Sequence, residues 1–112
     1  MIKVLGLLKR RADMSTETFR RYYETHHRVL GEKVLKGYAV KYQRRYLEAL
    51  DGNELEHDVL LEVWYPDAAT HQAASDHLSQ PKIAAEIAAD EEQLFDRTCN
   101  RFFTVTEVES SF

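Results

Sequence analysis

Two segments of the chain are apolar on both of their alternating faces, and this feature constrains the fold more than any other. Residues 2–9 place Ile2, Val4 and Leu8 on one side and leucines on the other. Residues 58–65 repeat the pattern, with Glu62 as an exception on one face. A strand of this kind is packed on both sides. We therefore expect a sheet that needs a cover on each face.

The rest of the chain alternates between helical and strand patterns. Ser15 is a suitable N-cap for a first helix, and Lys36-Gly37 suits its end. Period-two alternation and turn residues predict a central hairpin. In chain order, the expected elements are a strand over residues 2–9, a helix over about 16–35, strands over 38–50 and 58–65, helical stretches from Pro66-Asp67 and from Pro81, and a strand over 101–109.

This order, β-α-β-β-α-β, predicts an α+β, ferredoxin-like fold: a four-stranded antiparallel sheet with helices on one face. The strands over residues 2–9 and 58–65 would leave the other face apolar and exposed in a monomer, which is unusual. We therefore expect a homodimer that forms through the sheets.

Composition limits the size and the partners of the protein. The 112 residues are 44% hydrophobic, which fits a single domain over 1–112. The net charge of −4 gives no general attraction to nucleic acid. No apolar run is long enough for a membrane span or a secretory signal, and a single cysteine, Cys99, excludes an internal disulfide and a cysteine-based zinc cluster. We expect a cytoplasmic protein with no membrane partner and no metal site.

The adjacent histidines His26 and His27 are the first candidates for chemistry. On a regular helix, His26 lies within the arc of Phe19, Tyr23 and Leu30, and His27 lies at its flank. Imidazole suits general acid or base catalysis because its ordinary pKa is close to neutral. A packed histidine near a helix end is the alternative. Neighbouring helix positions point about 100° apart, so the pair alone cannot bind a metal.

Other candidate functional residues can also be explained by purely structural roles. Glu62 lies between Leu60 and Trp64, where burial would make it a proton donor, but cross-strand pairing with nearby basic residues is the more favoured interpretation. Asp90 and Glu91 are expected to break or cap the last helix. The other histidines, His57, His71 and His77, are expected at the surface, and Cys99 is expected to be an ordinary thiol.

Several blocks together resemble the EthD family. A strand that ends in basic residues is followed by a helix with the pattern S-x-E-x-F-R-x-Y-[WY]-x3-H. The matching blocks are residues 7–11, 14–23 with His27, 58–65, 90–96 and 102–107. The resemblance covers nearly the whole chain and is specific as a set.

The resemblance implies a dimeric α+β barrel of ferredoxin-like subunits. Similar proteins include accessory proteins of ether degradation, cofactor-free polyketide-tailoring enzymes and lactone isomerases. The resemblance places the family's helix-end histidine on His27 and a tyrosine of the second strand on Tyr38. Val29 stands where the family often has proline, so the exit from the helix is expected to differ. Val63 stands where the lactone isomerases have cysteine, which argues against thiol-dependent isomerase chemistry.

The leading hypothesis is a cofactor-independent proton-transfer enzyme of the dehydratase, cyclase, decarboxylase or isomerase type, acting on a small aromatic or polyketide-like molecule. We expect His27 and Tyr38 to be catalytic. The expected substrate-binding residues are Tyr23, His26, Trp64 and Glu62, with Tyr23, Tyr38 and Trp64 beside His27 in an aromatic-lined cavity. The alternatives are a non-catalytic binding or accessory protein of the same family, and a monooxygenase of the dimeric barrel superfamily.

Overall fold

The computed structural model describes residues 1–112 and contains the expected sequence of elements. Ser15 and Asp67 cap two of the helices: each side chain accepts a hydrogen bond from the backbone N–H three residues later. The elements are β1 (Ile2–Leu8), α1 (Thr16–Tyr22), a π-helical turn (Tyr23–His27), α2 (Arg28–Leu35), β2 (Lys41–Tyr46), β3 (Val59–Tyr65), α3 (Ala68–Leu78), α4 (Pro81–Glu91), a 3-10 turn (Arg97–Cys99) and β4 (Arg101–Thr104).

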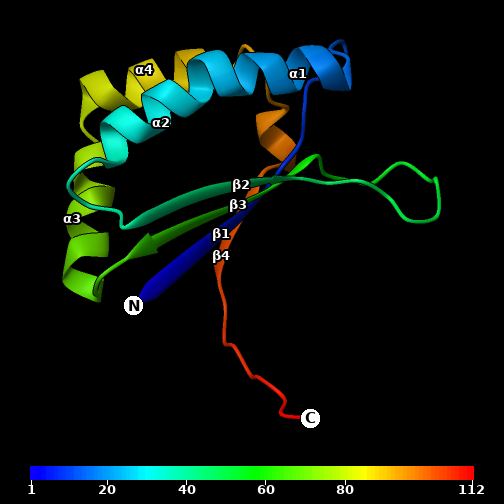
Figure 1. Cartoon of the computed structure of the whole chain (residues 1–112). Coiled ribbons are helices and arrows are strands. Elements are labelled where there is room, and N and C mark those ends of the chain that lie inside the picture. The colour runs from blue at the N-terminus through cyan, green and yellow to red at the C-terminus, as the bar shows by residue number, and fades with distance from the viewer.

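The four strands form one antiparallel sheet in the order β2-β3-β1-β4. The two strands that are apolar on both faces, β1 and β3, occupy the centre of this sheet. The helices lie on one side of the sheet, with α3 at one end of the strands (Figure 1). The predicted ferredoxin-like arrangement is therefore confirmed. No helix is both long enough and apolar enough to cross a membrane.

Two strands are shorter than the sequence pattern predicts. Before β2, the N–H groups of Tyr38 and Ala39 donate to the carbonyl of Leu35 at the end of α2, so they are not free to pair with β3. After Thr104 the chain has no strand partner and leaves the sheet (Figure 1). Alternation alone predicted residues 38–50 and 101–109 because it does not reveal where a pairing partner ends.

The helix expected over residues 16–35 forms, but its middle is a π-helical turn. The N–H of Arg28 donates to the carbonyl of Tyr23, five residues earlier, where an α-helix would use the residue four earlier. The hydroxyl of Thr25 donates to the carbonyl of Arg21 at 2.7 Å, a side-chain bond that is known to distort helices. This turn therefore contains one extra residue.

The core has two separate parts along the sheet. The first core cluster packs α1 and the segment after α4 against the ends of β1 and β3, and contains Leu8, Phe19, Tyr23, Val59, Leu94 and Phe95. The second core cluster lies at the α3 end and contains Val63, Tyr65 and Ala74. Both clusters lie on the face that the helices cover.

Candidate functional site

A cavity of about 390 Å³ lies between the helices and the sheet. Its walls are mostly apolar, with Leu30 and Val34 from α2 facing Leu61 from β3 and Phe102 from β4. The few polar side chains among the lining residues are His27, Tyr42, Tyr65, His71 and Ser75, and no Lys, Arg, Asp or Glu lines the cavity. The volume lies within the range of about 300–1,000 Å³ that is usual for small-molecule sites.

The π-turn determines which histidine reaches this cavity. Its extra residue moves His27 into the angular position that His26 would occupy on a regular helix. The side chain of His27 is only 14% exposed and lines the cavity. His26 is exposed and packs against Tyr22, with a ring distance of 4.7 Å. The helical-wheel placement of His26 in the buried arc was therefore wrong.

Asp90 and Tyr22 hold His27 at one nitrogen of its ring. Nδ1 of His27 lies 2.6 Å from Oδ2 of Asp90, and the Tyr22 hydroxyl donates to Oδ1 of the same carboxylate at 2.7 Å. The ionised carboxylate can only accept hydrogen bonds, so Nδ1 carries the proton. Burial, together with the neighbouring Asp90, raises the pKa of Tyr22 to about 12. Tyr22 therefore remains a donor at neutral pH.

The imidazole of His27 is also fixed by its aromatic neighbours. It packs edge to face against Tyr23 at 4.9 Å and against Phe95 at 5.1 Å. Its second nitrogen, Nε2, makes no hydrogen bond within the chain. In a neutral imidazole, a proton on Nδ1 leaves a lone pair on Nε2, and this is the arrangement of a general base.

Tyr42 on β2 supplies a second polar group to the cavity. Its ring lies against Gly31, where an added Cβ would be 2.9 Å from the Tyr42 hydroxyl oxygen, so any other residue there would displace the ring. Burial raises the pKa of Tyr42, which keeps the hydroxyl protonated. The Tyr23 hydroxyl is buried without a hydrogen-bond partner, and after burial the neighbouring Tyr42 also contributes to raising its pKa. The Tyr42 hydroxyl can accept from Tyr23 and still donate its own proton to a ligand.

Two further carboxylates lie on the helices near His27. Glu24 on the π-turn accepts from Arg44 at 2.6 and 3.0 Å and from the Tyr46 hydroxyl at 2.6 Å. The Arg44 guanidinium lowers the pKa of Glu24. Burial instead raises the pKa of Glu91, which follows Asp90. The helix α4 ends at Glu91, with Glu92 as its C-cap, so the expected end of the last helix does fall at this pair.

The other residues predicted for the site lie away from the cavity. Tyr23 is fully buried beneath His27 in the first core cluster. Tyr38 follows α2 and stacks on His77 of α3 at a ring distance of 4.9 Å. Trp64 lies on the opposite face of the sheet, between the ammonium groups of Lys3 at 4.3 Å and Lys41 at 4.2 Å. The structure therefore does not bring Tyr38 and Trp64 to His27.

Glu62 also lies on the face of the sheet opposite the helices. Its Oε2 is 3.3 Å from Nη2 of Arg45 and 3.9 Å from Nζ of Lys41. Burial acts to raise the pKa of Glu62, but the nearby indole N–H of Trp64 and these two cations outweigh it and lower the pKa. Glu62 is therefore a paired carboxylate on that face.

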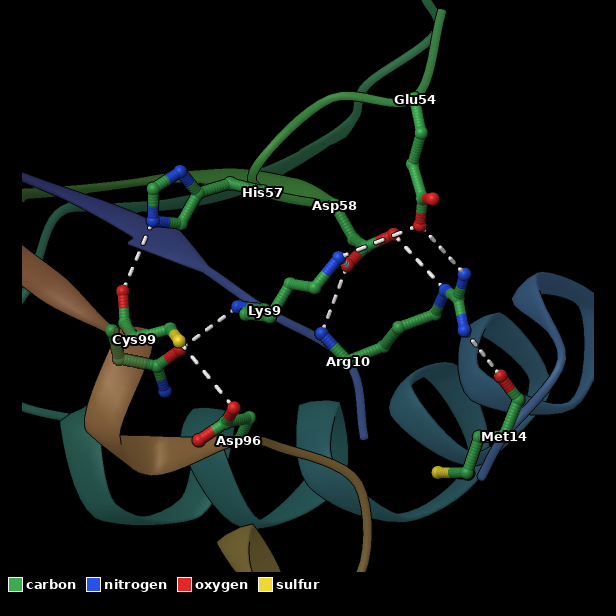
Figure 2. A network of polar contacts seen from close by, with 9 residues as sticks. Lys9, Arg10, Met14, Glu54, His57, Asp58, Asp96 and Cys99 are labelled. Atoms are coloured by element: carbon green, nitrogen blue, oxygen red, sulfur yellow. Dashed lines mark hydrogen bonds and ion pairs between the residues drawn. The ribbon is translucent and has the colours of Figure 1, made fainter. Parts of the chain in front are cut away.

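A second polar cluster joins the end of β1 to the hairpin loop and the 3-10 turn (Figure 2). Asp58 accepts from the backbone N–H of Arg10 at 2.9 Å, and Arg10 and Lys9 both reach Glu54. His57 contacts the backbone carbonyl of Cys99 at 3.0 Å. These groups use one another as partners, and this is the pattern of a structural network.

The EthD domain matches residues 11–98, so the chain belongs to the EthD family. No curated protein matches it.

Solved structures share the fold at low sequence identity. An ethyl tert-butyl ether d (EthD) family protein from Bacillus halodurans has a TM-score of 0.69 and 16% identity over 96% of this chain and 100% of that one. A dimeric protein with a ferredoxin-like fold from Bacteroides fragilis has a TM-score of 0.58 and 12% identity over 93% and 91% of the two chains. An antibiotic biosynthesis monooxygenase has a TM-score of 0.57 and 10% identity over 97% and 100%.

Four residues of the site were not predicted. Contacts between elements far apart in the chain bring these residues to the site; they are Tyr22, Asp90, Tyr42 and His71. The only sequence signal for Asp90 is its place in the late block, residues 90–96, that resembles the family.

Proposed function

We propose that the protein is a proton-transfer enzyme that acts on a small, enolisable or phenolic aromatic molecule with His27 as its general base. The observation that carries this proposal is the geometry of His27. Asp90 holds its Nδ1 at 2.6 Å, its Nε2 makes no hydrogen bond within the chain, and the residue lines the cavity. An oriented imidazole of this kind is suited to proton transfer near neutral pH.

The chemistry uses groups that are already in place. Nε2 of His27 takes a proton from the carbon beside a substrate carbonyl, and the C–H electron pair forms the C=C bond of an enolate. The Tyr42 hydroxyl donates a hydrogen bond to the enolate oxygen, where negative charge develops. Return of the proton from the imidazolium to a different atom of the enolate completes an isomerisation. In a dehydration, the enolate electrons expel a hydroxyl from the next carbon, and this hydroxyl takes the imidazolium proton and leaves as water. We assign the oxyanion role to Tyr42 instead of Tyr38 because Tyr42 lines the cavity.

The proposal is tested by deuterium incorporation into 2-tetralone, an uncharged bicyclic ketone, followed by NMR in D₂O. We expect the wild-type protein to accelerate exchange and His27→Ala to reduce the rate by about 100-fold or more, which is the usual contribution of a general base. His26→Ala is the matched control and is expected to keep the rate, because His26 is exposed. An unchanged rate in His27→Ala, or no acceleration by the wild type, would support the binding-protein alternative.

We also propose that two copies pair through the sheet face opposite the helices. Leu5 and Leu7 of β1 lie opposite Glu62 and Leu60 of β3 on that face, together with Trp64. Phe103 of β4, opposite Leu5, is 38% exposed. A partly apolar face without a cover favours self-association.

A further inference from the structure

We infer that the ligand of this cavity is an uncharged, elongated molecule with an oxygen function at each end, and that His71 and Ser75 bind the end remote from His27. This inference rests on the proposed function for the identity of the site. It adds a second polar end to the cavity and a chemical class for the ligand.

The two histidines of the cavity belong to different parts of the core. His27 packs on Phe95 of the first core cluster at 5.1 Å, whereas His71 packs on Tyr65 of the second at 5.0 Å. Along β3 the cavity is lined by Leu61, Val63 and Tyr65. The four residue steps from Leu61 to Tyr65 span about 13 Å of strand. The cavity therefore has a polar group toward each end of the sheet.

His71 and Ser75 act as a pair on α3. They are four residues apart, so both side chains lie on one face of the helix, and both line the cavity. Neither the ring nitrogens of His71 nor the hydroxyl of Ser75 makes a hydrogen bond within the chain. These groups can donate and accept, so they match a hydroxyl or a carbonyl of a ligand.

The lining excludes a charged ligand. No Lys, Arg, Asp or Glu faces the cavity, and the walls between the two histidines are formed by apolar side chains such as Val34, Leu61 and Phe102. A carboxylate or a phosphate placed there would lose its hydration without gaining a fixed counter-charge, which is costly. An aromatic diol or hydroxyketone has the required polarity at its ends.

Binding of three naphthalene probes, measured by calorimetry, tests this inference. The probes are 2-naphthol with one oxygen, naphthalene-2,6-diol with an oxygen at each end, and 6-hydroxy-2-naphthoate with a charge at one end. We expect the diol to bind about fivefold more tightly than the naphthol, because it gains one hydrogen bond. The naphthoate is expected to bind about tenfold or more weakly than the diol.

Two variants and one control assign the second end to α3. His71→Phe keeps a ring against Tyr65 and Ser75→Ala removes one hydroxyl, and both are expected to reduce the preference for the diol toward one. His77→Phe makes the same substitution on the same helix, at a histidine that stacks on Tyr38 outside the cavity. It is expected to leave the preference unchanged. Melting curves show whether each variant is folded. If His71→Phe does not fold, the diol preference of Ser75→Ala decides whether α3 binds the second end of the ligand.

Equal binding of naphthol and diol, tighter binding of the naphthoate, or an equal loss in His77→Phe would overturn the inference. The exchange assay with 2-tetralone reports separately on the proposed function. A diol preference that depends on His71 without any exchange would leave this inference standing and refute the catalysis. Exchange that depends on His27, without a diol preference, would support the catalysis and refute this inference.

Discussion

Oδ2 of Asp90 lies 2.6 Å from Nδ1 of His27, although the two residues are 63 positions apart in the chain. One comes from the last turn of α4 and the other from the end of the π-turn. Both side chains are 14% exposed. The contact both holds the ring and selects the tautomer that leaves Nε2 as the base.

Asp90→Asn is therefore expected to slow deuterium exchange by about 10- to 100-fold, less than the loss of His27 itself. The amide keeps the shape of the carboxylate but loses its charge. Its NH₂ group can also donate a hydrogen bond, so it no longer requires a proton on Nδ1 of His27. Nitrogen-15 NMR of the imidazole checks the mechanism: Nδ1 is expected to be protonated in the wild type and both tautomers to be present in the variant. A slowed variant with an unchanged tautomer would contradict the positioning role.

Gly31→Ala tests the packing of Tyr42. The added Cβ would lie 2.9 Å from the Tyr42 ring and hydroxyl, so the ring has to move. Alanine also favours the helix over glycine by about 1 kcal/mol, which offsets part of the cost. We expect binding of 2-naphthol to weaken by about fivefold or more with little change in melting temperature. Val29→Ala, at an exposed position of the same helix, is the control, and equal effects would refute this interpretation.

Glu24→Gln tests the contribution of the Glu24, Arg44 and Tyr46 contacts to stability. The pKa of Glu24 is lowered in the folded protein, chiefly by Arg44, from an ordinary value of 4.5. The stabilisation is thus complete above about pH 4.5 and is lost as the pH falls through the folded value. We expect the free energy of unfolding of the wild type to exceed that of the variant by roughly 1 kcal/mol at neutral pH. Solvent screening limits this difference.

Urea unfolding at several pH values measures this difference. The wild-type advantage is expected to shrink in acid. Glu17→Gln is the control, because its partner Arg21 is exposed and the pair should contribute little. A constant difference between wild type and Glu24→Gln at all pH values would show that charge is not the cause.

Leu5→Lys tests the proposed pairing of two copies. Leu5 lies on the sheet face opposite the helices, in register with Glu62 and Phe103. Sedimentation at micromolar concentration is expected to show a dimer for the wild type and a monomer for this variant. Leu50→Lys, in the fully exposed hairpin loop, is expected to remain dimeric. A monomeric wild type would refute the proposal.

The fold was largely predictable from the sequence because its elements are encoded locally. The two-sided apolar pattern of residues 2–9 and 58–65 marked the two central strands, and Ser15 marked the start of the first helix. The predicted ends of β2 and β4 were less accurate, because each strand ends where its pairing with the neighbouring strand, β3 or β1, ends.

The site was only partly predictable. His27 followed from the family resemblance, but the helical wheel favoured His26, because a wheel assumes that every turn is an α-turn. The roles of Asp90 and Tyr42 depend on contacts between distant elements, and single-residue patterns carry no information about those contacts.

The π-turn has a consequence for how this helix tolerates insertions and deletions. Removing one residue from it, such as Thr25, would restore α-helical geometry and leave His27 at the angular position that it has now. If the turn became α-helical without losing a residue, His26 would take that position instead. The doublet His26-His27 therefore presents an imidazole to the same place with either helix geometry. A comparison of relatives by gap-free alignment would then pair the wrong histidines.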